Sequence, residues 1–417
     1  MKRKKNKNIK TQDEKERQED AMIEELISEL SQEDAEMEDM KEKIRQRKWK
    51  FRKKVIIITS IILFLVIGSG LLIHFQTYTS ARTVATYSVG GSDNNYYKQF
   101  ADGVLRYSRD GIAFLDRKGE ERWNQSYQIK TPFIDVNDSA AAVADKGGND
   151  IVVVDKRGLK GEIHTTLPIE KISVSEQGVV SVLVKNDSGP KIMTYDAMGN
   201  VLAEVKASFA GTGYPLDISI SKDGKMLLVS YMSVQNGQAV TNIVYYYFDE
   251  AKKEDGDYKV LSEMYEDMLA PTVFFVNDSL AVAVGDDRLL LYSVNETPEL
   301  QQTITLDKKI KSVFYNQHYI GLVLKNEGKA GYELCLYNVR GQKVLSEDFT
   351  GDYSNVKLDG SQVIMYDGKK CSVFTRSGIH KFEGELGKDV LEMVATFGVN
   401  KYIVMNTDGM EIVRFVK

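Results

Sequence analysis

The segment VNDSAAAV at residues 136–143 returns as VNDSLAVAV at residues 276–284. Each copy is a turn followed by an apolar strand, because Asn and Asp favour tight turns and the residues after them lack helical spacing. Six further copies have their turns at Asp102, Gln177, Asp223, Gln317, Asp359 and Lys401. Most copies are followed by a second strand–turn–strand element, so one repeat supplies about four strands in about 40 residues.

This repeat predicts an all-β fold, an eight-bladed β-propeller over residues 83–417, with seven blades as the alternative. A helical solenoid of similar period is disfavoured, because the strands are rich in Val, Ile, Tyr and Phe. The last unit, at Met410–Lys417, lacks a fourth strand. We expect residues 83–89, which precede the first unit, to supply that strand and to close the ring.

Residues 55–75 contain no Lys, Arg, Asp or Glu, and this length is enough to cross a bilayer as one helix. Residues 41–54 contain nine basic residues, whereas Arg82 is the only basic residue between the apolar run and Lys98. The positive-inside rule therefore predicts a cell-membrane, single-pass protein with a cytoplasmic N-terminus and an extracytoplasmic C-terminal domain. A cleaved signal peptide is disfavoured by the length of the preceding segment. Residues 76–82 are expected to be a linker.

Residues 1–54 form a charged tail with 17 Lys/Arg and 14 Asp/Glu. Within residues 21–44, apolar side chains recur at three- and four-residue steps at Met22, Ile23, Leu26, Ile27 and Leu30. This spacing indicates an amphipathic helix that binds a cytoplasmic partner or forms a weak coiled coil. A mostly disordered tail is the open alternative. The basic stretches also suit anionic lipid headgroups.

The sequence contains no recognisable catalytic, cofactor or metal motif. The four histidines do not have metal-ligand spacing, and no phosphate loop, nucleophile elbow or Cys-x-x-Cys pair occurs. Cys335 and Cys371 align one position apart in neighbouring units, so their thiols should face apart and form no disulfide. The segment after residue 54 has a net charge of −8, which disfavours nucleic acid as a partner. We therefore predict a protein that is not an enzyme and binds no cofactor.

The fourth unit is the longest, with 55 residues between Asp223 and Asp278. Insertions in repeat proteins often lie on the binding face. The extra length falls in residues 231–240 and 248–258, and residues 207–215 and 265–271 are expected to be neighbouring loops. The predicted partner-binding residues in this region are Tyr214, Met232, Gln235, Asn236, Tyr265 and Met268. Packing of these side chains against the blade edges is the open alternative.

The segment AFLDRKGEERW at residues 113–123 resembles the Ala-x-Asp-x-x-x-Gly-x-x-x-Trp repeat of the quinoprotein-dehydrogenase-like propellers, the superfamily that includes BamB-like proteins. It departs from that repeat, because Phe114 stands at the Ala position and one residue is missing between Asp116 and Gly119. The whole layout, a charged tail, one apolar helix and repeats to the C-terminus, also resembles an uncharacterised family of membrane-anchored propellers from Gram-positive bacteria. That family implies no known chemistry.

These observations favour a non-enzymatic extracytoplasmic binding module or scaffold that binds a protein of the cell envelope. A transmembrane receptor, in which the propeller senses an envelope ligand and the tail reports it, is the first alternative. A relic of a quinone-cofactor dehydrogenase is the second, although no ligand set for a metal near the propeller axis is recognisable.

Overall fold

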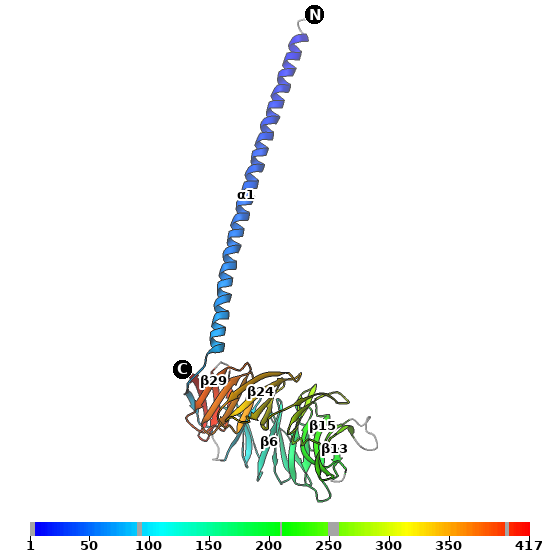
Figure 1. Ribbon diagram of the computed structural model, residues 1–417. Helices are drawn as coiled ribbons and strands as arrows, with labels where there is room; N and C mark the ends of the chain where they lie inside the picture. Colours follow the sequence, from blue (N-terminus) through cyan, green and yellow to red (C-terminus); the bar gives the residue numbers. More distant parts are fainter. Residues whose placement is uncertain (1–4, 90–93, 209–210, 249–257, 397–399) are drawn as a thin grey trace. The chain divides into compact units, whose positions relative to one another are not determined.

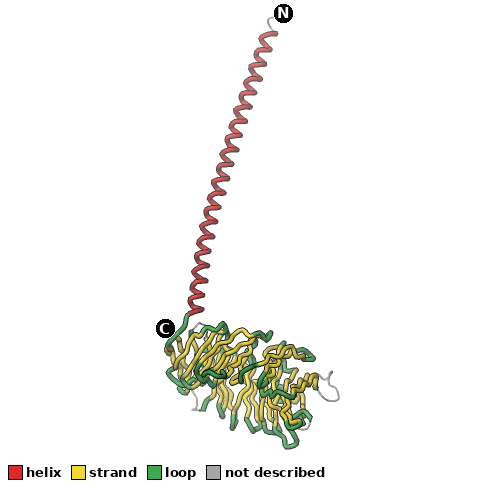
Figure 2. The backbone as a smooth tube through the Cα atoms, in the orientation of Figure 1, coloured by secondary structure: helices red, strands yellow, loops and turns green. Residues whose placement is uncertain are grey.

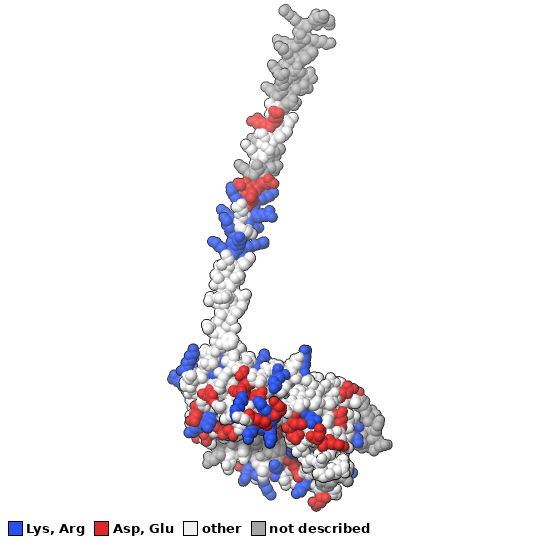
Figure 3. Space-filling view, in the orientation of Figure 1, with Lys and Arg blue, Asp and Glu red and all other residues white. Residues whose placement is uncertain are grey.

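The computed structural model describes residues 5–89, 94–208, 211–248, 258–396 and 400–417. The chain divides into two units, Met1–Gln76 and Thr77–Lys417. The first unit is a single helix, α1 (Lys5–Phe75), which is long and apolar enough over its second half to cross a membrane (Figure 1). The helix is longer than the sequence pattern indicated, since it continues through the charged tail into the apolar run without a break. Figure 3 shows Lys and Arg side chains gathered on α1 directly before a stretch that carries no charged side chain.

The second unit is an eight-bladed β-propeller, as predicted. All its sheets have four antiparallel strands, and Figure 2 shows these strands joined by loops and turns throughout the unit. From the innermost to the outermost strand, blades 1 to 4 are β2 (Tyr96–Phe100), β3 (Gly103–Tyr107), β4 (Gly111–Leu115), β5 (Glu121–Ser126); β6 (Pro132–Val136), β7 (Ala140–Asp145), β8 (Asp150–Asp155), β9 (Gly158–His164); β10 (Ile169–Val174), β11 (Val180–Val184), β12 (Lys191–Tyr195), β13 (Val201–Lys206); and β14 (Tyr214–Ile220), β15 (Met226–Gln235), β16 (Gln238–Tyr247), β17 (Lys259–Tyr265).

In the same order, blades 5 to 8 are β18 (Thr272–Asn277), β19 (Leu280–Val284), β20 (Arg288–Ser293), β21 (Glu299–Thr305); β22 (Ile310–Tyr315), β23 (Tyr319–Lys325), β24 (Tyr332–Asn338), β25 (Lys343–Phe349); β26 (Asn355–Asp359), β27 (Gln362–Asp367), β28 (Lys370–Thr375), β29 (His380–Glu385); and β30 (Glu392–Ala395), β31 (Lys401–Asn406), β32 (Gly409–Val416), β1 (Ser80–Tyr87). The N-terminal strand β1 thus completes the last blade, which confirms the predicted closure. It begins at Ser80 and ends at Tyr87, two residues before the expected Val89, and Tyr78 already bridges to Phe382, so the linker is shorter than residues 76–82.

The hydrophobic core lies between the blades. The described residues form eight clusters of buried side chains, and each cluster is shared by two neighbouring blades, so that together they follow the whole ring. Alternate residues of a strand point to opposite faces, and both faces of a blade are covered here. This explains why every residue of strands such as β7 and β11 is buried, instead of every second residue.

Polar side chains on the innermost strands connect consecutive blades. The Asp135 carboxylate accepts a hydrogen bond from the Val174 amide at 2.8 Å, and Asp217 accepts one from the Val273 amide at 2.9 Å. Asp359 does the same for Ala395 at 2.6 Å. Each bond satisfies a backbone N–H group on the axial side of an inner strand, where no further strand is available.

Candidate functional site

Blade 4 has a hairpin that projects beyond its neighbouring strands. Strands β15 and β16 contain 10 residues each, but β14 pairs with β15 only as far as Met232 and β17 pairs with β16 only as far as Thr241. Beyond them, residues 233–240 pair only with each other, and we call this segment the tip. Asn236 and Gly237 connect the strands with φ values of 51° and 81°, as a type I′ turn requires. The tip is therefore a pre-organised two-stranded ribbon.

The structure brings the six sequence-predicted residues together at one end of blade 4. Met232 pairs with Tyr214 on one side and with Thr241 on the other, and Thr241 pairs with Tyr265. Gln235 and Asn236 lie in the tip. The expectation of a loop over residues 231–240 was wrong, because most of this segment is strand. The other expected insertion lies largely at residues 249–257, outside the described residues.

Three of the six side chains are held by the fold. Met268 is only 2% exposed and belongs to the core between blades 4 and 5. The Tyr214 hydroxyl donates to Glu170 at 2.7 Å, and this bond raises its pKa to about 12. The Tyr265 hydroxyl donates to Glu263 at 2.8 Å and lies 2.8 Å from the Tyr292 hydroxyl, and burial raises its pKa to about 12.

Sequence reasoning missed the two most exposed apolar side chains in this region. Val234 is 69% exposed and Met264 is 58% exposed, and the Gln235 amide lies 3.7 Å from the Met264 sulfur. A signal was available in the sequence, because residues 226–248 contain no charged residue in a chain that is 28% charged. The tip and Met264 thus form an uncharged surface.

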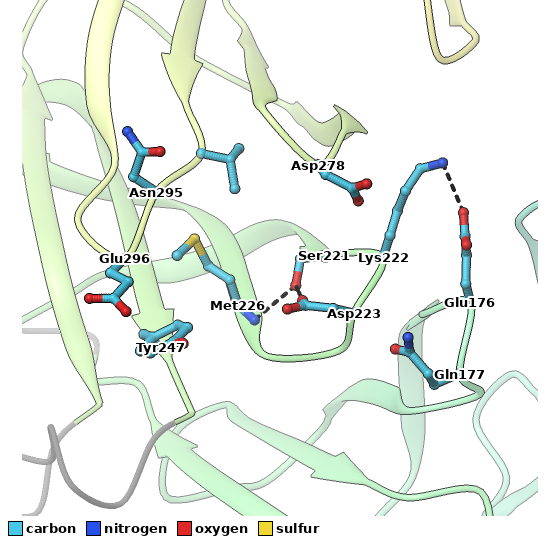
Figure 4. A pocket seen from close by; sticks show the side chains of 11 residues that line it. Glu176, Gln177, Ser221, Lys222, Asp223, Met226, Tyr247, Asp278, Asn295 and Glu296 are labelled. Atoms are coloured by element: carbon cyan, nitrogen blue, oxygen red, sulfur yellow. Dashed lines mark hydrogen bonds and ion pairs between the residues drawn. The ribbon is translucent and has the colours of Figure 1, made fainter.

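A cavity of about 390 Å³ lies at the opposite end of blades 3 to 5, where first and second strands are connected by turns (Figure 4). Its lining includes the side chains of Met226 and Tyr247, four carboxylates and one ammonium group. The lining residues are Glu176, Gln177, Ser221, Lys222, Asp223, Met226, Tyr247, Asp278, Val294, Asn295 and Glu296. The excess of carboxylates makes this cavity unsuitable for anions.

Turns next to this cavity are joined across the ring. Lys222 of blade 4 forms ion pairs with Glu176 of blade 3 at 2.8 Å and with Asp138 of blade 2 at 3.3 Å. The Gln317 amide of blade 6 donates to the same Asp138 carboxylate. Blades 2 and 6 are four blades apart in a ring of eight, so this contact crosses the propeller axis.

The described part of the chain contains no group of three His, Cys, Asp or Glu side chains arranged to hold a metal. Cys335 and Cys371 are free and buried, and burial raises the pKa of each thiol to about 12. They face different blade interfaces, as the sequence predicted. His164 contacts Asp150 at 2.8 Å and His380 contacts Ser372 at 2.9 Å, in two different blades.

The fold defines the class of this protein as an eight-bladed β-propeller that follows one long N-terminal helix with an apolar second half. Within that class, residues 74–415 match the Family of unknown function (DUF5711), and the chain belongs to this family. The resemblance to an uncharacterised propeller family is thereby confirmed, and a Gram-positive origin stays a prediction. No curated protein matches the chain.

Solved structures with a similar fold include BamB from Moraxella catarrhalis, which is 13% identical with a TM-score of 0.49 and matches over 81% of this chain and 100% of that chain. A eukaryotic initiation factor is 10% identical with a TM-score of 0.44 over 73% and 91%. The Pan2 WD40 domain of Neurospora crassa is 7% identical with a TM-score of 0.43 over 82% and 97%. Likeness at these identities concerns the fold alone.

Proposed function

We propose that this chain is a membrane-anchored binding protein of the cell envelope, in which the propeller binds a partner protein through the end of blade 4. The partner surface consists of the tip, Met264 and the exposed parts of Met232 and Tyr265. Helix α1 serves as the single membrane anchor, with the N-terminus cytoplasmic and the propeller extracytoplasmic. The propeller has no enzymatic role in this proposal.

The observation that carries the proposal is the absence of charge on the tip. Unpaired strand edges invite pairing with other chains, and proteins normally protect them with charged residues. Each of the eight outermost strands contains at least one charged residue, such as Arg82 in β1 or Glu299 in β21. The tip contains none, although its residues 234–239 are exposed. A projection that is uncharged, unprotected and partly apolar has the composition that is usual for a contact surface.

The position of the tip also suits this role. Strand β1 enters blade 8 beside the end of β32, at the end of the ring where first and second strands are connected by turns. The tip lies at the other end of the ring, because a connection between the second and third strands is always opposite the first turn. Residues 77–80, which lead into β1, therefore lie at the end of the propeller opposite the proposed surface.

The test compares envelope proteins that are co-purified with the full-length, detergent-solubilised protein and with two variants. Val234→Lys introduces a charge into the tip, whereas Val344→Lys places the same charge on an exposed valine of β25 in blade 6. We expect Val234→Lys to lose a partner that the wild-type protein and Val344→Lys both retain, by tenfold or more, which corresponds to at least ~1.4 kcal/mol. Equal capture by all three proteins would refute the proposal.

A further inference from the structure

The part of α1 that precedes the apolar run exposes large apolar side chains. In the described residues 21–28, 31–32 and 37–54 of this helix, the exposed set is Met22, Ile23, Leu26, Ile27, Met37, Met40, Ile44, Trp49 and Phe51, at 47–70% exposure. A charged helix that buries no apolar face has little to stabilise it in water, since most helical stability comes from packing. These side chains therefore indicate that α1 packs against another helix.

The spacing of these residues is that of a coiled coil. Ile23, Met37, Ile44 and Phe51 are separated by multiples of seven residues, and Leu26 and Met40 follow the first two of them by three residues. These are the a and d positions of a heptad repeat. Lys41, Lys43 and Lys48 occupy the flanking e and g positions, and Glu38 and Gln46 lie on the outer face at positions b and c. The repeat covers four heptads. All five a positions are apolar, with Leu30 as the fifth, whereas two of the four d positions are charged, at Glu33 and Arg47.

We propose that residues 23–51 of α1 form a parallel two-stranded coiled coil with the same residues of a second copy of this chain. This proposal uses the proposed membrane anchoring for one point only, namely that the two helices are parallel. Two copies anchored in one membrane are parallel and at the same depth, so each a residue meets its own counterpart. The heptad phase also continues into the apolar run, where Ile58 and Leu65 fall at a and Gly68 falls at d. A glycine at this position permits close approach of two helices in a bilayer.

Charge does not prevent this arrangement. Lys43 and Lys48 of opposite helices are like-charged neighbours at g and e positions, but both side chains are exposed, so water and salt screen their repulsion. Lys43 is also paired with Asp39 of its own helix at 2.5 Å, which reduces the repulsion. Arg47 occupies a d position, where the aliphatic part of its side chain can pack between the two helices while its guanidinium group reaches water.

A coiled coil would place two propellers side by side in one assembly. Two copies of the partner surface then act together, and binding to a partner with two sites gains avidity without any new contact. This consequence extends the proposed function, but the coiled coil itself does not depend on it.

The test is disulfide crosslinking of the full-length protein in its native membranes. Met37→Cys and Ile44→Cys place thiols at a positions, where the two helices meet. Glu38→Cys and Gln46→Cys are matched controls on the outer face. The natural cysteines are buried in the propeller and give no background. Mild oxidation should crosslink the two a-position variants into dimers several-fold more than the two controls. Equal crosslinking at all four positions, or none at 37 and 44, would overturn the proposal.

A second measurement separates the coiled coil from the anchoring. With Ile23→Cys as reporter, the added pair Met37→Glu and Ile44→Glu should abolish the dimer, whereas Glu38→Gln with Gln46→Glu should leave it unchanged. If the dimer persisted in the variant with Met37→Glu and Ile44→Glu, these a positions would not form the contact between the two helices. Alkaline extraction of the same membranes tests the anchor by itself. A protein that is extracted by alkali but still crosslinks at positions 37 and 44 more than at positions 38 and 46 would support the coiled coil and refute the membrane anchoring.

Discussion

Ser80 lies directly opposite Val416 in the paired strands β1 and β32, although 336 positions separate the two residues in the sequence. The Ser80 hydroxyl donates to the Val416 carbonyl at 3.5 Å. Tyr78, two residues earlier, is buried against Phe415 with ring centroids 6.5 Å apart. The first and last strands of the propeller thus share one blade, and closure of the ring depends on this contact.

We expect Tyr78→Ala to weaken the closed ring. The substitution removes a buried aromatic side chain from the interface of blades 7 and 8 and should lower the free energy of unfolding by about 3 kcal/mol. Tyr96→Ala is the control, because this side chain is 53% exposed. Chemical denaturation of the solubilised protein measures both. An unchanged unfolding midpoint for Tyr78→Ala would show that the residue preceding β1 does not secure the ring.

Asp135 should make the propeller more stable toward acid. Burial raises its pKa from 3.8 to about 6, with Asp217 adding to the effect and Lys98 opposing it. The folded state therefore favours the protonated form, and the stabilisation present below pH 3.8 is lost as the pH rises through about 6. Asp135→Asn keeps an oxygen for the Val174 amide but carries no charge. At pH 7.5 it should be more stable than the wild type by at most about 3 kcal/mol.

The gain from Asp135→Asn should shrink toward zero at pH 4, because the wild-type side chain is then largely protonated in the folded protein. Asp389→Asn, at an exposed position, is the matched control and should show no such trend. Thermal unfolding at pH 4 and pH 7.5 is sufficient for the comparison. A variant that is less stable than the wild type at pH 7.5 would contradict the raised pKa of Asp135 in the folded protein.

The apolar side chains at the end of blade 4 should separate into packing residues and contact residues. Met268→Ala leaves a cavity in the core between blades 4 and 5 and should lower the free energy of unfolding by about 2–5 kcal/mol. Val234→Lys changes only an exposed side chain and should alter it by less than ~0.5 kcal/mol. If Val234→Lys destabilised the propeller as much as Met268→Ala, the tip would be a packing element.

The two thiols should be inert in the folded protein. Their pKa values of about 12 leave almost no thiolate at pH 8, and both side chains are fully buried. We expect an aromatic disulfide reagent to release its chromophore only after denaturant is added, in an amount equal to two thiols per chain. Rapid reaction of either cysteine under native conditions would indicate that its blade interface opens.

The topology is tested by adding protease to intact protoplasts. Because residues 41–54 carry nine basic residues on the N-terminal side of the apolar run, we expect the propeller to be digested and the tail to be protected. Antibodies against each segment identify the surviving fragment. Protection of the propeller with loss of the tail would reverse the orientation, and with it the proposed envelope partner.

The sequence by itself determined the repeat, the blade number and the closing strand. These depend on local features, namely turn residues, short apolar strands and their period, which can be recognised without knowing what each strand packs against. It also placed Tyr214, Met232, Gln235, Asn236, Tyr265 and Met268 at the same end of blade 4, because insertions in one repeat stay together.

Only the tertiary structure decided which of these side chains are accessible. Met268 looks like a loop residue in the sequence but is buried by blade 5, whereas Val234 looks like a core strand residue but is exposed because β14 and β17 end before they reach it. The contact between Asp138 and Gln317 across the ring has no sequence signal at all. Burial and contacts across the axis depend on where separate blades end in space, and a one-dimensional period does not contain that information.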